Sequence, residues 1–227
     1  MEKLGLNFLG KREGSVSVVR LTRESRVSVA IEAGKLNDPL EAYKTDLLTG
    51  IPFFNHMLFG LASRAILRLS ANFEQTAEAA PKFAHVVCED VGLTLGAAVR
   101  ALIEERMKKG VEQRGFYQVA FDDGLVVATL AFDGRPYCYF LSSKGQRNEL
   151  VEGLEASSLK QFFEGFAIGA GANIVIESKQ PSEQWQDPHH AWEATFKAFG
   201  EALRQCIAYC PEKAGTTIGL KGTTKEG

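Results

Sequence analysis

The pattern of apolar and polar positions predicts two sets of strands and helices that follow the same order along the chain. The first set comprises strands at 15–21 and 26–32, a short helix at 53–63, a strand at 66–72 and a long helix at 83–109. The second set comprises strands at 117–121, 125–132 and 137–142, a short helix at 159–170, a strand at 173–177 and a final helix from Asp187. A recurring order of this kind is typical of an internal duplication.

Individual residues of the two sets also correspond. A displacement of 104 positions pairs residues of the two long helices: His85 with His189, Glu89 with Glu193 and Gly96 with Gly200. A displacement of 105 positions pairs residues of the two short helices: Gly60 with Gly165 and Ala62 with Ala167. Helical periodicity alone does not match particular glycines, so we interpret the chain as a duplication. Residues 14–109 form the first repeat, 110–222 the second, and 1–13 an N-terminal extension.

The final helix carries a pattern typical of metal binding. Asp187-Pro188 favours a helix start, since aspartate caps free amides and proline fits the first turn. His189 and Glu193 are four residues apart and therefore project from one helical face. An imidazole nitrogen beside a carboxylate oxygen is half of a site for a divalent transition metal. His85 and Glu89 repeat the same spacing, so each repeat carries one such pair.

The two repeats differ at the positions where further ligands are expected. His56 in the first short helix corresponds to Gln161, and His190 corresponds to Val86. Valine cannot bind a metal, and a glutamine amide is a weak ligand for a borderline metal. We therefore expect one strong site made of His56, His85, Glu89 and His190. The second site, at His189 and Glu193, is expected to be weak or empty.

Composition and charge exclude several classes of protein. The chain of 227 residues is long enough for one large domain or two small ones. Its formal charge of -2 gives no electrostatic reason to expect nucleic acid or an anionic membrane as partner. No apolar run approaches the ~20 residues of a membrane span. The four cysteines lack CxxC spacing, and the first residues do not resemble a secretory signal. We expect a cytoplasmic protein.

Five blocks of sequence, spread between about Val18 and Lys221, carry further motifs. They are Arg20–Ser25, Thr49–Leu58, His85–Asp90, Gly134–Tyr137 and His189–Ala198. In this order they resemble the imidazoleglycerol-phosphate dehydratase family, the manganese-dependent lyases of histidine biosynthesis. Asn55 and Gly219 depart from the family motifs, which have aspartate and serine at these places.

The resemblance implies a fold and an assembly. The fold is α+β, an internal duplication of two similar halves, each a four-stranded sheet with helices packed on one face. Family members form trimers that assemble into a shell of 24 subunits, with manganese bound between subunits. A homo-oligomer built from trimers, without a nucleic-acid or membrane partner, is therefore expected.

The resemblance also implies a reaction, the dehydration of imidazole glycerol phosphate to imidazole acetol phosphate with Mn²⁺ as Lewis acid. Glu24 and Asp123, in corresponding turns, are the candidate general acid/base carboxylates. Arg114, Arg135 and Lys221 are the candidates for binding the phosphate. Turns favour polar residues in any case, so a solvated carboxylate or a surface arginine is the alternative at these positions.

Two other functions stay open because two metal ligands differ from the family pattern. One is a paralogous metal-dependent lyase that acts on another small phosphorylated substrate. The other is a non-catalytic metal-binding shell protein. Retention of both histidine–glutamate pairs argues against the second, since drift without selection would erode them.

Overall fold

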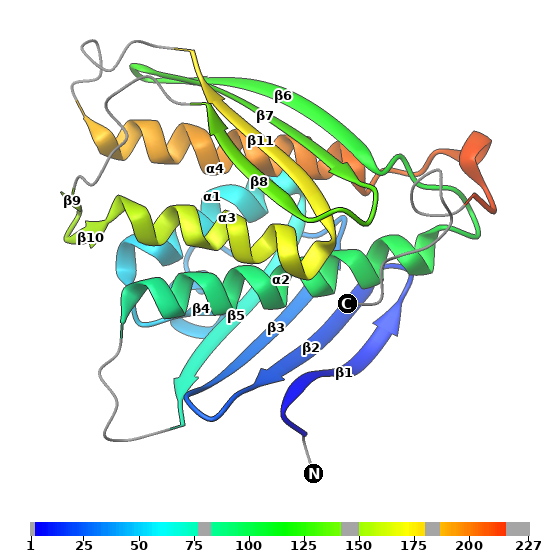
Figure 1. Ribbon diagram of the computed structural model, residues 1–227, viewed down its shortest axis with the longest axis horizontal. Helices are drawn as coiled ribbons and strands as arrows, with labels where there is room; N and C mark the ends of the chain where they lie inside the picture. The colour runs from blue at the N-terminus through cyan, green and yellow to red at the C-terminus, as the bar shows by residue number, and fades with distance from the viewer. Residues whose placement is uncertain (1–2, 77–82, 142–149, 180–186, 217–227) are drawn as a thin grey trace.

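The computed structural model describes residues 3–76, 83–141, 150–179 and 187–216. Two sheets enclose a central layer of helices, so the described chain forms three layers (Figure 1). Each sheet turns one face toward the helices and the other outward. None of the described helices is long and apolar enough to cross a membrane.

The first half supplies one sheet and two α-helices. Its elements are β1 (Gly5–Arg12), β2 (Ser15–Leu21), β3 (Ser25–Ala33), the π-helical turn η1 (Ala42–Asp46), β4 (Leu47–Leu48), α1 (Pro52–Ala65), β5 (Leu67–Gln75) and α2 (Ala84–Arg106). The strands lie in the order β1-β2-β3-β5-β4, and β4 runs parallel to β5. Alternation places Val27, Val29 and Ile31 of β3 in the core, in agreement with the strand predicted at 26–32.

The second half repeats this arrangement. Its elements are β6 (Arg114–Phe121), β7 (Gly124–Phe132), β8 (Tyr137–Leu141), the hairpin β9 (Leu150–Val151) and β10 (Leu154–Glu155), α3 (Ala156–Ala170), β11 (Ala172–Ser178), α4 (Pro188–Cys206) and the 3₁₀ turn η3 (Pro211–Lys213). The strand order β6-β7-β11-β8 matches β2-β3-β5-β4 of the first half, and β8 runs parallel to β11. The α+β class and the two similar halves are confirmed. The first sheet has a fifth strand because β1 pairs with the outer edge of β2.

Each short helix packs on the long helix of the other half: α3 on α2, and α1 on α4. Two equivalent glycines permit these contacts. A Cβ at Gly96 of α2 would overlap the carbonyl oxygen of Phe166 in α3. A Cβ at Gly200 of α4 would likewise overlap the carbonyl oxygen of Leu61 in α1. Backbones can approach this closely only where no side chain intervenes. The repeated glycines are therefore explained by close helix contact between the halves.

Aromatic side chains seal the junction between the halves. Phe54 of α1, Phe162 of α3 and Phe196 of α4 are fully buried. Ring centroids of Phe162 and Phe196 lie 5.2 Å apart, and Phe54 meets Phe162 edge-on at 5.5 Å. Since these rings come from both halves, the two repeats share one hydrophobic core.

The substitution Gly96→Ala is expected to lower the free energy of unfolding by about 2–3 kcal/mol, because the added methyl group overpacks a tight helix contact. Gly60→Ala in α1 is the matched control, since a Cβ there would meet only Lys197 Cγ at 3.9 Å. That variant should be neutral or up to about 1 kcal/mol more stable, from helix propensity alone. Urea unfolding of both variants measures the difference. An equal loss in the free energy of unfolding would contradict the close contact between α2 and α3.

Candidate metal centre

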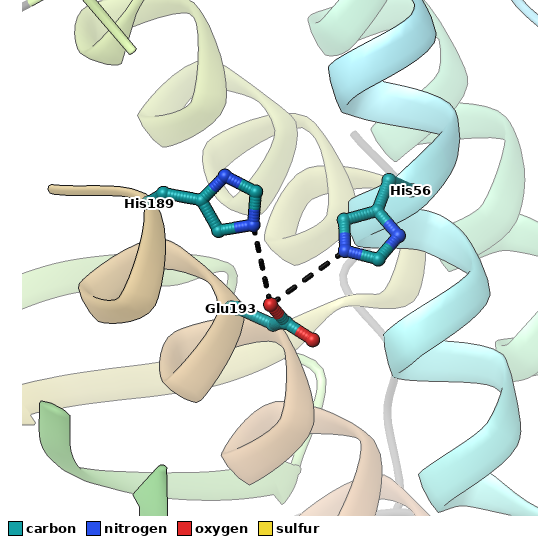
Figure 2. A group of neighbouring side chains, drawn as sticks. All are labelled: His56, His189 and Glu193. Carbon is teal, nitrogen blue, oxygen red and sulfur yellow. Dashed lines mark ion pairs between the residues drawn. The ribbon is translucent and has the colours of Figure 1, made fainter. Parts of the chain in front are cut away.

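Three possible metal ligands from two helices converge on one point (Figure 2). His56 comes from α1, and His189 and Glu193 come from the first turns of α4. One ligand atom from each lies within 4.8 Å of the other two. Nε2 of His189 is 3.3 Å and Nε2 of His56 is 3.6 Å from the same oxygen, Oε2 of Glu193.

The start of α4 fixes two of these ligands. Pro188 is the first helical residue, and the Asp187 carboxylate accepts a hydrogen bond from the His189 backbone N–H at 2.9 Å. The spacing of four residues then places His189 and Glu193 on one face, as predicted. Because α1 packs on α4, His56 faces this pair across the helix contact.

A single chain does not bring His56 together with His85, Glu89 and His190, so the grouping expected from the sequence stays a prediction. His56 instead joins the histidine–glutamate pair of the opposite repeat. The physical reason is that each short helix packs on the long helix of the other repeat, not on that of its own repeat. Two residues of the same repeat can therefore lie far apart in space.

The two histidines are held at their other ring nitrogen by groups outside the cluster. His56 Nδ1 lies 3.2 Å from the hydroxyl of Tyr43, which belongs to η1. His189 Nδ1 lies 3.3 Å from Oε1 of Glu152, in the turn between β9 and β10. Metal-binding histidines usually have such a partner, since it orients the ring and sets its tautomer.

The environment of Glu193 keeps its carboxylate charged. Burial raises the pKa of Glu193, but a 2.8 Å hydrogen bond from Lys197 and the charges of Lys197, His56 and His189 hold it below its ordinary value. Lys197 is fixed in turn, with Nζ 3.2 Å from the centroid of the Phe121 ring. Two imidazole nitrogens and an ionised carboxylate suit a divalent transition metal, so these residues fit such an ion.

The other histidine–glutamate pair lies at the start of α2. His85 and Glu89 are exposed, and the Phe83 ring stacks on His85 at a centroid distance of 5.4 Å. Gln161 is on α3, the helix that packs on α2, one turn before Gly165, where a Cβ would overlap the Glu89 carbonyl. Gln161 thus occupies the place in this half that His56 occupies in the other. Within the described residues, no third histidine, cysteine or acidic ligand joins His85 and Glu89.

His190 faces a different set of partners from His189. Its Nδ1 lies 2.8 Å from Asp123 Oδ1, and its Nε2 lies 3.6 Å from Asp122 and 3.9 Å from Asp187. The hydrogen bond with Asp123 and the nearby negative charges raise the pKa of His190, although burial acts against them. This geometry follows from the helix, because successive residues are about 100° apart around its axis.

The two candidate carboxylates occupy corresponding turns. Asp123 lies between β6 and β7 and contacts His190, while Glu24 is exposed between β2 and β3. Asp90 of α2 holds the Glu24 turn, since it accepts hydrogen bonds from Arg20 at 2.6 Å and from the Ser25 hydroxyl at 2.5 Å. Glu24 therefore lies at the same end of α2 as the exposed His85–Glu89 pair.

The candidate phosphate ligands lie elsewhere. Arg114 begins β6 beside the C-terminal end of α4, where the Phe116 N–H donates to Gln205 at 3.0 Å. Arg135 follows β7 at the same end of the sheet, since Arg114 pairs with Ala131 in the antiparallel ladder. Both are exposed and far along the sheet from His190. Lys221 lies outside the described residues.

A cavity of about 550 Å³ opens beside the cluster. His56, His189 and Phe53 line one side, and Glu152 with Gly153 lines another. A duplicated α+β fold with histidine and carboxylate ligands beside a cavity of this size defines a class of metal-binding enzyme that acts on small molecules.

Comparison with known proteins narrows this class to a family. The sequence model of the imidazoleglycerol-phosphate dehydratase family matches residues 49–203. The imidazoleglycerol-phosphate dehydratase of Heliobacterium modesticaldum is 34% identical over 206 residues, covering 91% of this chain and 97% of that protein. The one of Azoarcus sp. (strain BH72) is 32% identical, covering 90% and 96%. The crystal structure of IGPD from Pyrococcus furiosus in complex with (S)-C348 has a TM-score of 0.68 at 26% identity, covering 90% and 99%.

The chain therefore belongs to the imidazoleglycerol-phosphate dehydratase family, a family of metal-dependent carbon–oxygen lyases.

Substitution of Asp90 tests the anchor of the Glu24 turn. Asp90→Asn should lower the free energy of unfolding by about 2 kcal/mol, because it removes the charge that satisfies Arg20 and the buried Ser25 hydroxyl. Glu104→Gln is the control in the same helix, since its ion pair with Arg100 is exposed and worth at most about 0.5 kcal/mol. Thermal and urea unfolding measure both variants. An unchanged free energy of unfolding in Asp90→Asn would show that Asp90 does not hold the Glu24 turn.

Proposed function

We propose that this protein removes water from imidazole glycerol phosphate to give imidazole acetol phosphate, a step of histidine biosynthesis, in the cytoplasm. The observation that carries the proposal is the convergence of His56, His189 and Glu193 beside a cavity. It occurs in a chain whose residues 49–203 match the dehydratase family. The phosphorylated imidazole is a small substrate that suits the cavity volume of about 550 Å³.

The proposed metal is Mn²⁺, with its strong site at His56, His189 and Glu193. The weak site is at His85 and Glu89, where Gln161 replaces the short-helix histidine and Val86 replaces the second histidine of the long helix. When bound, the metal supplies Lewis-acid activation of the imidazole ring and a template for its orientation. His190 is turned away from the strong site and is available to a neighbouring copy of the chain.

The acid/base work is assigned to Glu24 and Asp123. Dehydration removes a proton from carbon and delivers a proton to the departing hydroxyl, so one carboxylate can serve both steps in turn. Asp123 shares a hydrogen bond of 2.8 Å with His190, and this pair can hold a proton between an oxygen and a nitrogen. Glu24 is exposed and carried on a turn fixed by Asp90, so it can face a substrate bound by another subunit.

The positions of the arginines support an oligomer. The eight residues of β6 separate Arg114 from the turn that contacts His190, and they span ~23 Å at ~3.3 Å per residue. A single small substrate cannot reach both ends of the strand. If Arg114 and Arg135 bind phosphate, together with Lys221, they do so for a site on a neighbouring copy. We propose that this neighbouring copy belongs to the trimers, assembled further into a shell of 24 subunits, that the family resemblance implies.

One observation favours a second candidate function, a paralogous metal-dependent lyase that acts on another small phosphorylated substrate. Val86 and Gln161 stand where the family pattern has ligands, so the geometry of the metals around the ring can differ from that of the dehydratase. The non-catalytic metal-binding shell protein is the third possibility, and the ordered ligand geometry of the strong site argues against it.

The test is turnover of imidazole glycerol phosphate by metal-stripped protein reloaded with Mn²⁺, with bound manganese counted in the same sample. Glu193→Gln should reduce kcat/KM by about 10²- to 10³-fold, the usual cost of removing an electrostatic group at the reacting centre. Glu164→Gln, an exposed change on α3, should leave turnover unaltered. If the wild-type protein binds manganese and shows no turnover, the dehydratase proposal is wrong.

A further inference from the structure

We infer that Glu152 is a positioning residue of the metal centre: its carboxylate holds the His189 ring in the orientation in which Nε2 points at the metal position. The inference rests on the proposed function, because it assigns a role within the same site. Glu152 belongs to no motif of the sequence, and neither repeat pattern marks it.

The backbone at Glu152 has a conformation that a glutamate rarely adopts. Glu152 and Gly153 form the two-residue turn between β9 and β10, with φ of 50° and 76°. Hairpin turns with positive φ at both positions favour asparagine, aspartate or glycine at the first of them. A glutamate here is strained, and strained residues are concentrated at functional sites.

The side chain of this strained residue reaches a metal ligand. Glu152 Oε1 lies 3.3 Å from Nδ1 of His189, while Nε2 of the same ring points to Glu193 Oε2 at 3.3 Å. The two carboxylates therefore lie against the two different nitrogens of one imidazole. The Phe53 ring packs on the same imidazole at a centroid distance of 5.1 Å and restricts its tilt.

The chemistry of the acceptor suits a histidine whose Nε2 binds a metal. A metal at Nε2 would take the lone pair of that nitrogen and leave the ring proton on Nδ1, where a carboxylate oxygen can accept it. Tyr43 lies at the corresponding nitrogen of His56, but its hydroxyl can either donate or accept. Glu152 is therefore the more specific of the two outer partners.

A purely structural role for Glu152 makes a different prediction. If the residue only fills a turn, glycine at this position should relieve the strain without any effect on metal binding. If Glu152 positions His189, the same substitution should relieve the strain and weaken the site. The two effects have opposite signs and can be measured on the same variant.

The experiment compares Glu152→Gly with Glu155→Gln, which removes a carboxylate from the same hairpin where its nearest described partner is Ser157. The dissociation constant for Mn²⁺ is measured from the free-ion signal in electron paramagnetic resonance. Glu152→Gly should bind Mn²⁺ about 10- to 100-fold more weakly, as outer partners of metal-binding histidines usually contribute. Glu155→Gln should bind like wild type. Unfolding temperature of the metal-free Glu152→Gly variant should be equal or higher.

Glu152→Gln, whose amide oxygen can still accept a hydrogen bond from Nδ1 of His189, should retain more of the Mn²⁺ affinity than Glu152→Gly. Unchanged Mn²⁺ affinity in Glu152→Gly, or an equal loss in Glu155→Gln, would overturn the inference. Absence of turnover in wild type would refute the proposed function alone.

Discussion

Close contact between helices of opposite repeats is the constraint on which the rest of the structure depends. Gly96 and Gly200 remove the side chains that would keep α2 from α3 and α4 from α1. The contact joins the two halves, and the buried rings of Phe54, Phe162 and Phe196 lie at this junction. It also brings His56 to the face of α4 that carries His189 and Glu193. Stability and metal binding thus have a common origin in the packing of the helices.

Electrostatics at the centre follow from that packing. Glu193 is half-buried and faces two imidazoles and Lys197, so it remains ionised although burial alone would raise its pKa. Lys197 Nζ lies 2.8 Å from Oε1 of Glu193, while the histidine nitrogens face Oε2. The two carboxylate oxygens therefore have different partners: Oε1 contacts the lysine, and Oε2 faces the two histidines. A cation bound at Oε2 need not displace Lys197, because the lysine is held on the Phe121 ring.

Much of the fold could be predicted from the sequence because its signals are local and repeated. Alternating strands, helix starts at proline and matching glycines predicted both halves and the pairing of His189 with Glu193. That His56 joins this pair could not be predicted, because the spacing of residues in the sequence does not show that α1 packs on α4. The equivalent glycines indicated that each long helix has a close neighbour, but not which helix this neighbour is.

The outer residues of the site show a second limit of sequence reasoning. Tyr43 and Glu152 come from a π-helical turn and a short hairpin, which have no periodic pattern. Their roles depend on contacts of their side chains with His56 and His189, which the sequence does not show. Asp90 could be singled out from the sequence, since it follows Glu89 in a motif. Its hydrogen bonds with Arg20 and Ser25 could not be predicted, because these residues lie about 70 positions earlier in the chain.

Anomalous diffraction at the manganese edge, from crystals grown with less than one Mn²⁺ per chain, locates the site that manganese occupies first. We expect the strongest peak between His56 of α1 and the His189–Glu193 pair of the same chain, within bonding distance of both Nε2 atoms and Oε2. A peak that joins His56 to His85 and Glu89, or no peak beside His56, would contradict it.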